Sequence, residues 1–208
     1  MKSSILQKVR ALQTRLLEIL VRKNPGLGLG QRAESFVSFF ESEIPENSRV
    51  LDIGGRWGFY AGPLEKRGHF PVILDVVRPG LQNAPVVIYD GAVMPFPDKS
   101  FDVSLLMTVL HHIPDRDQVL REARRVTRHK VIVVEDLYHH TLGRFWTILR
   151  DCFYNFEWVG HPCGFKTRAG WESYFEKQGF RVLSCREVVT RLCGLKILNG
   201  IFILEVPV

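Results

Sequence analysis

The sequence predicts an α/β protein with a doubly wound, mostly parallel sheet. From residue 49 onward, short apolar runs alternate with helical stretches, which is typical of a parallel sheet flanked by helices. Because the runs are apolar at nearly every position, we expect strands that are covered on both faces. The runs lie at 50–53, 71–75, 86–89, 101–106 and 130–134.

Helices are expected between these strands, and two further strands near the end of the chain. The helical candidates lie around 58–67, 115–127 and 168–178. Apolar runs at 180–185 and 197–206 are close together in the sequence. Such a pair favours an antiparallel ending to the sheet.

The segment before the first strand has a different character. Apolar residues at helical spacing predict an amphipathic helix over 3–22 with a basic opposite face. Glycines at 26–30 follow, and then a second helix over 31–43. We therefore divide the chain into an N-terminal helical extension, 1–45, and a main domain, 46–208. The first helix has three open roles: covering the site, pairing with another subunit or resting on a membrane surface.

Composition places the chain among ordinary globular proteins. Hydrophobic residues make up 46% of the 208 residues and charged residues 24%. No run approaches the ~18–20 apolar residues of a membrane span, and charges interrupt the N-terminal segment too early for a signal peptide. The four cysteines form no CxxC pair and show no zinc spacing. We expect a cytoplasmic protein with reduced thiols and no metal site.

The formal net charge of +6 is compatible with an anionic substrate, nucleic acid or an acidic membrane. Most basic residues are scattered singly, as on a solvated face. We therefore expect no dedicated nucleic-acid groove. The oligomeric state is not predicted.

The most informative stretch is the end of the first strand, which reads V-L-D-I-G-G-R-W-G over 50–58. Glycine at Gly54, Gly55 and Gly58 allows a tight turn and a close approach of backbone to a ligand. The helix that follows offers its N-terminal N–H groups to an anionic group. The dinucleotide pattern GxGxxG is not met.

This stretch resembles the first motif of class I S-adenosylmethionine-dependent methyltransferases, which commonly reads V-L-D-I-G-C-G-x-G. Asp52, Gly54 and Gly58 match it, and Gly55 stands where cysteine or alanine is common. Arg56 takes the place of the usual middle glycine. Either this arginine leaves the turn intact, with its side chain toward solvent or the cofactor carboxylate, or it crowds the pocket and weakens binding.

The resemblance continues over 49–136 in the right order. Asp75 ends the second strand, where the family uses an acid to hydrogen-bond the ribose hydroxyls. Asp90 stands where the family contacts the adenine amino group, with Gly91 leaving room for the ring. From Met107 the chain reads M-T-V-L-H-H, like the exit of the family's fourth strand.

The resemblance implies a Rossmann-like, seven-stranded sheet with an antiparallel final strand, and S-adenosyl-L-methionine as cofactor. The cofactor-binding residues that it implies are Asp52, Gly54, Gly55, Arg56, Gly58, Asp75, Asp90, Gly91 and Met107.

A general base is needed only if the methyl acceptor must lose a proton, and histidine suits that task near neutral pH. We predict His112 as this base, while His111 either joins it or packs as a cap. Glu135 and Asp136, with the histidines at 139–140, are interpreted as a surface loop rather than a metal site.

An aromatic-rich segment at 141–161 follows the fifth strand. It either covers a hydrophobic acceptor as a lid or packs into the core as an extra helix.

The function predicted is methyl transfer to a small molecule such as a lipid or secondary metabolite. One alternative is a non-catalytic binding or regulatory protein on the same fold, motivated by Arg56. Another is a nucleic-acid methyltransferase, motivated by the basic charge; the chain lacks the N-P-P-[YF] motif that many such enzymes carry after strand four.

Overall fold

The computed structural model of the chain describes residues 28–77, 84–155, 162–192 and 194–207, together with Leu12 and Ile19. The helix predicted over 3–22 otherwise lies outside the described residues. The same holds for the last part, 156–161, of the aromatic-rich segment. Among the described residues, no helix has the length and apolar character that crossing a membrane requires.

Seven strands form one sheet in the order β3-β2-β1-β4-β5-β7-β6. β1 to β5 are parallel, and β7 runs antiparallel to both β5 and β6. The predicted sheet with its antiparallel ending is therefore confirmed. The strands are β1 Arg49–Ile53, β2 Phe70–Asp75, β3 Val86–Ile88, β4 Phe101–Met107, β5 Thr127–Asp136, β6 Arg181–Leu192 and β7 Leu195–Glu205.

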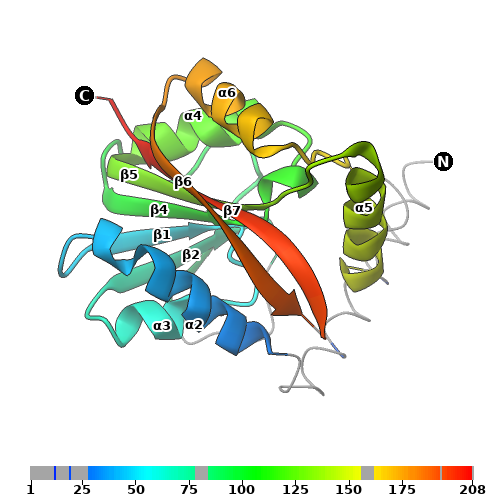
Figure 1. Cartoon of the computed structure of the whole chain (residues 1–208). Helices are drawn as coiled ribbons and strands as arrows, with labels where there is room; N and C mark the ends of the chain where they lie inside the picture. The colour runs from blue at the N-terminus through cyan, green and yellow to red at the C-terminus, as the bar shows by residue number, and fades with distance from the viewer. Residues whose placement is uncertain are drawn as a thin grey trace.

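Helices cover both faces of this sheet (Figure 1). One face carries α2 (Leu29–Phe40) and α3 (Ala61–Glu65), and the other carries α4 (Arg116–Val126) and α6 (Arg168–Lys177). α5 (Thr141–Asn155) stands apart from both layers, beyond the carboxyl ends of the parallel strands (Figure 1). Short 3₁₀ turns lie at η2 (Glu41–Glu43) and η3 (Leu110–His112).

The core has one apolar cluster on each side of the sheet, as alternation along a strand requires. On β1, Val50 packs with Phe36 of α2 and Leu64 of α3. The next residue, Leu51, joins the cluster that contains Trp171 of α6. The buried side chains of α2 thus extend the core of the sheet, although the proposed boundary between residues 45 and 46 remains a prediction.

Pairing lengthens two strands beyond their apolar runs. β5 begins at Thr127 rather than residue 130 because Thr127 pairs with β4, and it continues to Asp136 because its last residues pair with β7. β6 continues to Leu192 because it pairs with β7 along almost its whole length. Since backbone hydrogen bonds are made regardless of side-chain polarity, apolar runs alone underestimate such strands.

Candidate functional site

The first glycine turn follows β1 and redirects the chain into α3. Gly54 has a φ of 71° and Gly58 a φ of 68°, both in the left-handed region that favours glycine. The Gly54 N–H donates to the Leu74 carbonyl of β2 at 2.7 Å. A Cβ on Gly54 would lie 2.5 Å from Cγ2 of Val109. Both the backbone conformation and the space around it therefore require glycine at this position.

Arg56 keeps the turn intact although it replaces the usual glycine. Its φ of 31° is positive, and its N–H donates to Oδ2 of Asp75 at 2.9 Å. The guanidinium lies over the Trp57 ring, 5.1 Å from the ring centroid. This cation–π contact holds the Arg56 side chain against the next residue of the turn.

Two acids lie at the carboxyl ends of β1 and β2. Asp52 is 1% exposed, and neither of its carboxylate oxygens has a hydrogen-bond partner within the described part of the chain. Burial, helped by the negative charge of Asp75, raises the pKa of Asp52 to about 7. A Cβ on Gly55 would lie 2.3 Å from Oδ2 of Asp52, so the glycine leaves room for this carboxylate.

Asp75 is held in place by the backbone. Its Oδ2 accepts from Arg56 and its Oδ1 accepts from the Val77 N–H at 3.0 Å. A carboxylate has about four acceptor positions, so two remain for a ligand. The structure thus brings Asp52, Asp75 and Arg56 together at one turn.

The remaining predicted cofactor residues lie on neighbouring segments. Asp90 is exposed after β3, where its Oδ1 accepts from the Ala92 N–H at 2.9 Å. Gly91 has a φ of 87°, and a Cβ there would lie 3.4 Å from the Val76 side chain. Met107 is buried at the end of β4.

A second group of buried polar residues forms where β4 ends. Thr108 has a φ of 53° and donates its N–H to the Val134 carbonyl of β5 at 2.6 Å. η3 follows, and Glu135 of β5 fixes it at two points. Its Oε1 accepts from the Leu110 N–H at 2.7 Å, and its Oε2 accepts from Nδ1 of His111 at 2.5 Å.

His111 is 1% exposed and stacks on Phe165, with 4.3 Å between ring centroids. Burial lowers the pKa of His111, but the negative charges of Glu135 and Asp151 and the hydrogen bond to Glu135 outweigh this and raise it to about 10. The carboxylates of Glu135 and Asp151 therefore stabilise a positive charge on this ring.

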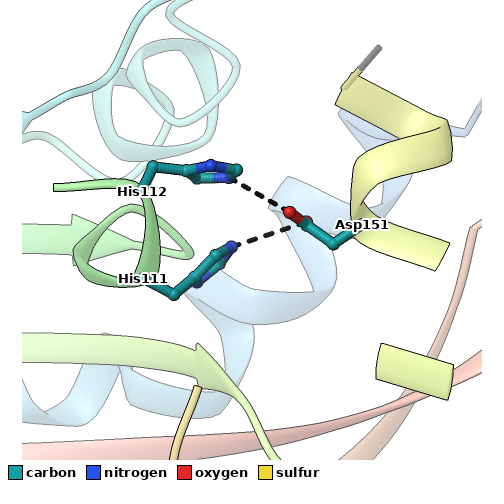
Figure 2. Close-up of side chains that lie close together, drawn as sticks. All are labelled: His111, His112 and Asp151. Carbon is teal, nitrogen blue, oxygen red and sulfur yellow. Dashed lines mark ion pairs between the residues drawn. The ribbon is translucent and has the colours of Figure 1, made fainter. Parts of the chain in front are cut away.

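His112, the predicted base, lies beside His111, with 4.2 Å between the ring centroids. Its side chain is 23% exposed, and its Nε2 is 3.7 Å from Oδ2 of Asp151. Oδ1 of the same carboxylate is 3.5 Å from Nε2 of His111. Figure 2 shows both imidazole rings directed at Asp151. Asp151 in turn accepts from Nδ2 of Asn155 at 2.9 Å.

The sequence interpretation missed Asp151 because it considered only the aromatic residues of this segment, either as a lid over the acceptor or as core. The structure contradicts the core packing. Phe145, Trp146 and Leu149 are exposed, and the buried residues of α5 are Thr147, Asp151 and Cys152. Phe145 and Leu149, which the sequence placed at helical spacing for core packing, therefore do not pack in the core. Thr147 and Asp151, four residues apart, were the available sign of a polar inner face.

The neighbouring acid Asp136 faces the opposite side of the sheet. It pairs with Arg150 of α5 and accepts from Nδ2 of Asn199 at 2.6 Å. Arg32 of α2 is 3.9 Å away. Glu135 and Asp136 thus lie in different clusters. His139 and His140 join neither: both are exposed, and His139 lies 3.5 Å from Glu187.

Comparisons with known proteins agree with this arrangement. A family model described as a methyltransferase domain matches residues 51–134. The structure resembles a putative methyltransferase from Bacillus halodurans C-125 with a TM-score of 0.65 and 14% identity, covering 84% of this chain and 100% of that one. It also resembles a SAM-dependent methyltransferase from Methanosarcina mazei, with a TM-score of 0.62 and 19% identity over 80% and 96% of the two chains.

Residues 51–134 therefore match a methyltransferase domain, and the chain has the fold of solved SAM-dependent methyltransferases. These findings support the predicted class I methyltransferase with S-adenosylmethionine as its cofactor. The roles of individual residues toward that cofactor remain predictions.

Sequence relatives match only part of the chain. An uncharacterized methyltransferase from Mycobacterium sp. (strain KMS) is 34% identical over 91 residues, 40% of this chain and 36% of the relative. A demethylmenaquinone methyltransferase from Corynebacterium efficiens is 32% identical over 91 residues, 41% of this chain and 40% of the relative. The matched region therefore spans two fifths or less of these relatives.

Proposed function

We propose that this protein transfers the methyl group of S-adenosylmethionine to a small-molecule acceptor. The observation that carries the proposal is Asp52, a buried acid at the end of β1 whose oxygens have no hydrogen-bond partner in the described residues. Such a group is costly unless a ligand supplies a donor or a positive charge. The ammonium group of the cofactor's methionine moiety meets this requirement.

The other residues at this turn fit the same ligand. Asp75, held by two backbone N–H groups, has acceptor positions left for the ribose hydroxyls. Gly54 and Gly58 keep side chains away from the turn. When bound, the cofactor supplies an activated methyl group on a sulfonium, and the protein's task is to orient the acceptor and exclude water.

The acceptor is proposed to lie near η3 and α5. His112 is the candidate that removes a proton from the acceptor, and its Nε2 lies 3.7 Å from Oδ2 of Asp151. The exposed Phe145 and Trp146 of α5 are suited to contact an apolar acceptor. One matched relative is named for demethylmenaquinone, which supports a small-molecule acceptor.

Calorimetric titration with S-adenosylmethionine and its demethylated product tests the cofactor assignment. We expect micromolar binding of both. In Asp75→Ala the affinity should fall about tenfold or more, as expected when charge-assisted hydrogen bonds worth ~1.5–3 kcal/mol are lost. A folded sample that binds neither compound would contradict the proposal, and unchanged affinity in Asp75→Ala would remove the ribose assignment. Transfer of labelled methyl groups to a panel of small-molecule acceptors then tests the reaction itself.

A further inference from the structure

Three potential ligand side chains converge at the carboxyl end of β4. His111 and His112 come from η3, and Asp151 comes from α5. Their ligand atoms all lie within 4.8 Å of one another. Figure 2 shows the two rings and the carboxylate facing a common point between η3 and α5.

The separations within this cluster suit a bound ion. Nε2 of His111 is 3.5 Å from Asp151 Oδ1, and Nε2 of His112 is 3.7 Å from Oδ2. Both distances exceed the ~2.7–3.2 Å of a good N–H···O hydrogen bond. Two ligands bound at ~2.0–2.1 Å to a tetrahedral zinc ion lie about 3.3–3.4 Å apart. Because all the ligand atoms lie within 4.8 Å of one another, a contraction of up to about 1.5 Å would place one ion between them.

The groups behind the ligands are those that metal sites use for orientation. His111 donates Nδ1–H to Glu135 at 2.5 Å, which leaves the Nε2 atom directed at Asp151. This is the carboxylate–histidine arrangement found behind many histidine ligands of zinc. Asp151 itself accepts from Nδ2 of Asn155 at 2.9 Å. Both a histidine and the carboxylate are thus oriented by a second residue.

We propose that His111, His112 and Asp151 bind a divalent transition-metal ion of the zinc class. Two imidazoles and one carboxylate are a ligand set that such ions favour. Three protein ligands leave a fourth position open for water or for an oxygen of the acceptor. The three residues lie where the proposed function places the methyl acceptor, near η3 and α5. Ion binding itself does not depend on methyl transfer.

The metal changes the role of His112. As a ligand, its Nε2 lone pair is engaged and cannot also accept a proton from the acceptor. The base assignment above therefore applies to the metal-free protein alone. The sequence predicted no metal here, since the carboxylate ligand lies about forty residues after the histidines.

Direct titration of the 208-residue chain tests the proposal. After treatment with a chelator, the protein is titrated with Zn²⁺ by calorimetry at neutral pH, in competition with a zinc indicator. We expect one equivalent to bind. His112→Ala and Asp151→Asn should each weaken binding by more than ~100-fold, and Glu135→Gln by about 10–100-fold. His139→Ala, at an exposed histidine near Glu187, should bind as the unchanged protein does.

Co²⁺ provides a readout that a purely structural role would not change. Tetrahedral Co²⁺ bound at this site should give strong visible absorption, and His112→Gln should reduce it while keeping the side-chain size. Circular dichroism melting shows that each variant is folded, and S-adenosylmethionine titration of the same samples reports the cofactor site separately. Absence of stoichiometric binding, or equal binding by His112→Ala and His139→Ala, would overturn the metal site and leave the proposed methyl transfer standing.

Discussion

Asp52 and Glu135 are both buried carboxylates near the carboxyl ends of parallel strands, β1 and β5, yet their surroundings differ. Glu135 accepts from Leu110 and His111, so the protein itself compensates its burial. Neither Asp52 oxygen has a hydrogen-bond partner in the described residues. Since burying a charged acid without partners costs free energy, we propose that a ligand pairs with Asp52, whereas Glu135 holds η3. The four predictions below test this difference.

The largest expected effect is on stability at the Glu135 end. His111→Leu leaves the Glu135 carboxylate buried with one hydrogen bond, and breaking such a buried pair costs about 3–5 kcal/mol. Denaturant unfolding followed by circular dichroism measures the loss. His139→Leu, at a 64% exposed side chain, should cost less than ~0.5 kcal/mol. Similar losses in the two variants would show that Glu135 is not compensated by His111.

Gly54→Ala should affect both stability and cofactor binding. The new Cβ would lie 2.5 Å from Val109 at a φ of 71°, and a left-handed non-glycine residue alone costs about 1–2 kcal/mol. We expect unfolding at lower denaturant and at least tenfold weaker binding of S-adenosylmethionine. Gly30→Ala has open space around its Cβ in α2, so it should leave cofactor affinity unchanged. Equal affinities in both variants would exclude the turn from the cofactor site.

Asp52→Asn should stabilise the protein and weaken cofactor binding. The folded-state pKa of about 7 lies above the ~3.9 of an exposed aspartate. The stability that its proton contributes is therefore present below about pH 4 and lost as the pH rises through about 7. At pH 8 we expect Asp52→Asn to gain about 1–3 kcal/mol, because the buried charge is removed.

Unfolding measured between pH 4 and pH 8 checks this sign. Between pH 4 and pH 8, titration of Asp52 should lower the stability of the unchanged protein. In Asp52→Asn this decrease should be absent. Its affinity for S-adenosylmethionine should drop, since the partner of the ammonium group is gone. Loss of stability at pH 8 together with unchanged affinity would mean that groups of the protein stabilise the buried carboxylate of Asp52, as they do that of Glu135.

The smallest effect is expected for Arg56→Gly. Its φ of 31° carries a backbone cost that glycine avoids, and the net gain after glycine's own entropy is about 0.5–1 kcal/mol. Cofactor affinity should stay equal or rise, because the hydrogen bond to Asp75 comes from the backbone. A loss of affinity above tenfold would assign the guanidinium a direct role in binding.

The sequence was sufficient for the fold and for the Asp52 end of the site. Each strand is a continuous run, and Asp52, Gly54 and Gly58 lie within seven residues, so local pattern alone locates them. Strand lengths were less predictable, since β5 and β6 are extended by backbone pairing. The sequence also left open whether Arg56 keeps the turn intact, because this depends on its backbone φ and on its hydrogen bond to Asp75.

The other end of the site depends on contacts between distant residues. Asp151 reaches His112 from a helix about forty residues later, and no spacing rule connects them. The composition of α5 was misleading as well. Aromatic residues normally predict the buried face of a helix, but here Phe145 and Trp146 are exposed.

The last residues of β5 also restrict how the chain can vary in length. Glu135 and Asp136 point to opposite faces, one toward η3 and the other toward Arg32 of α2. The preceding residues, 131–134, are apolar and fully buried on both faces, so they would tolerate a slip of one residue. The two acids would not, because a single insertion or deletion before them exchanges their faces and breaks both clusters together. The two acids at the end of β5, rather than its apolar residues, therefore prevent insertions and deletions within this strand.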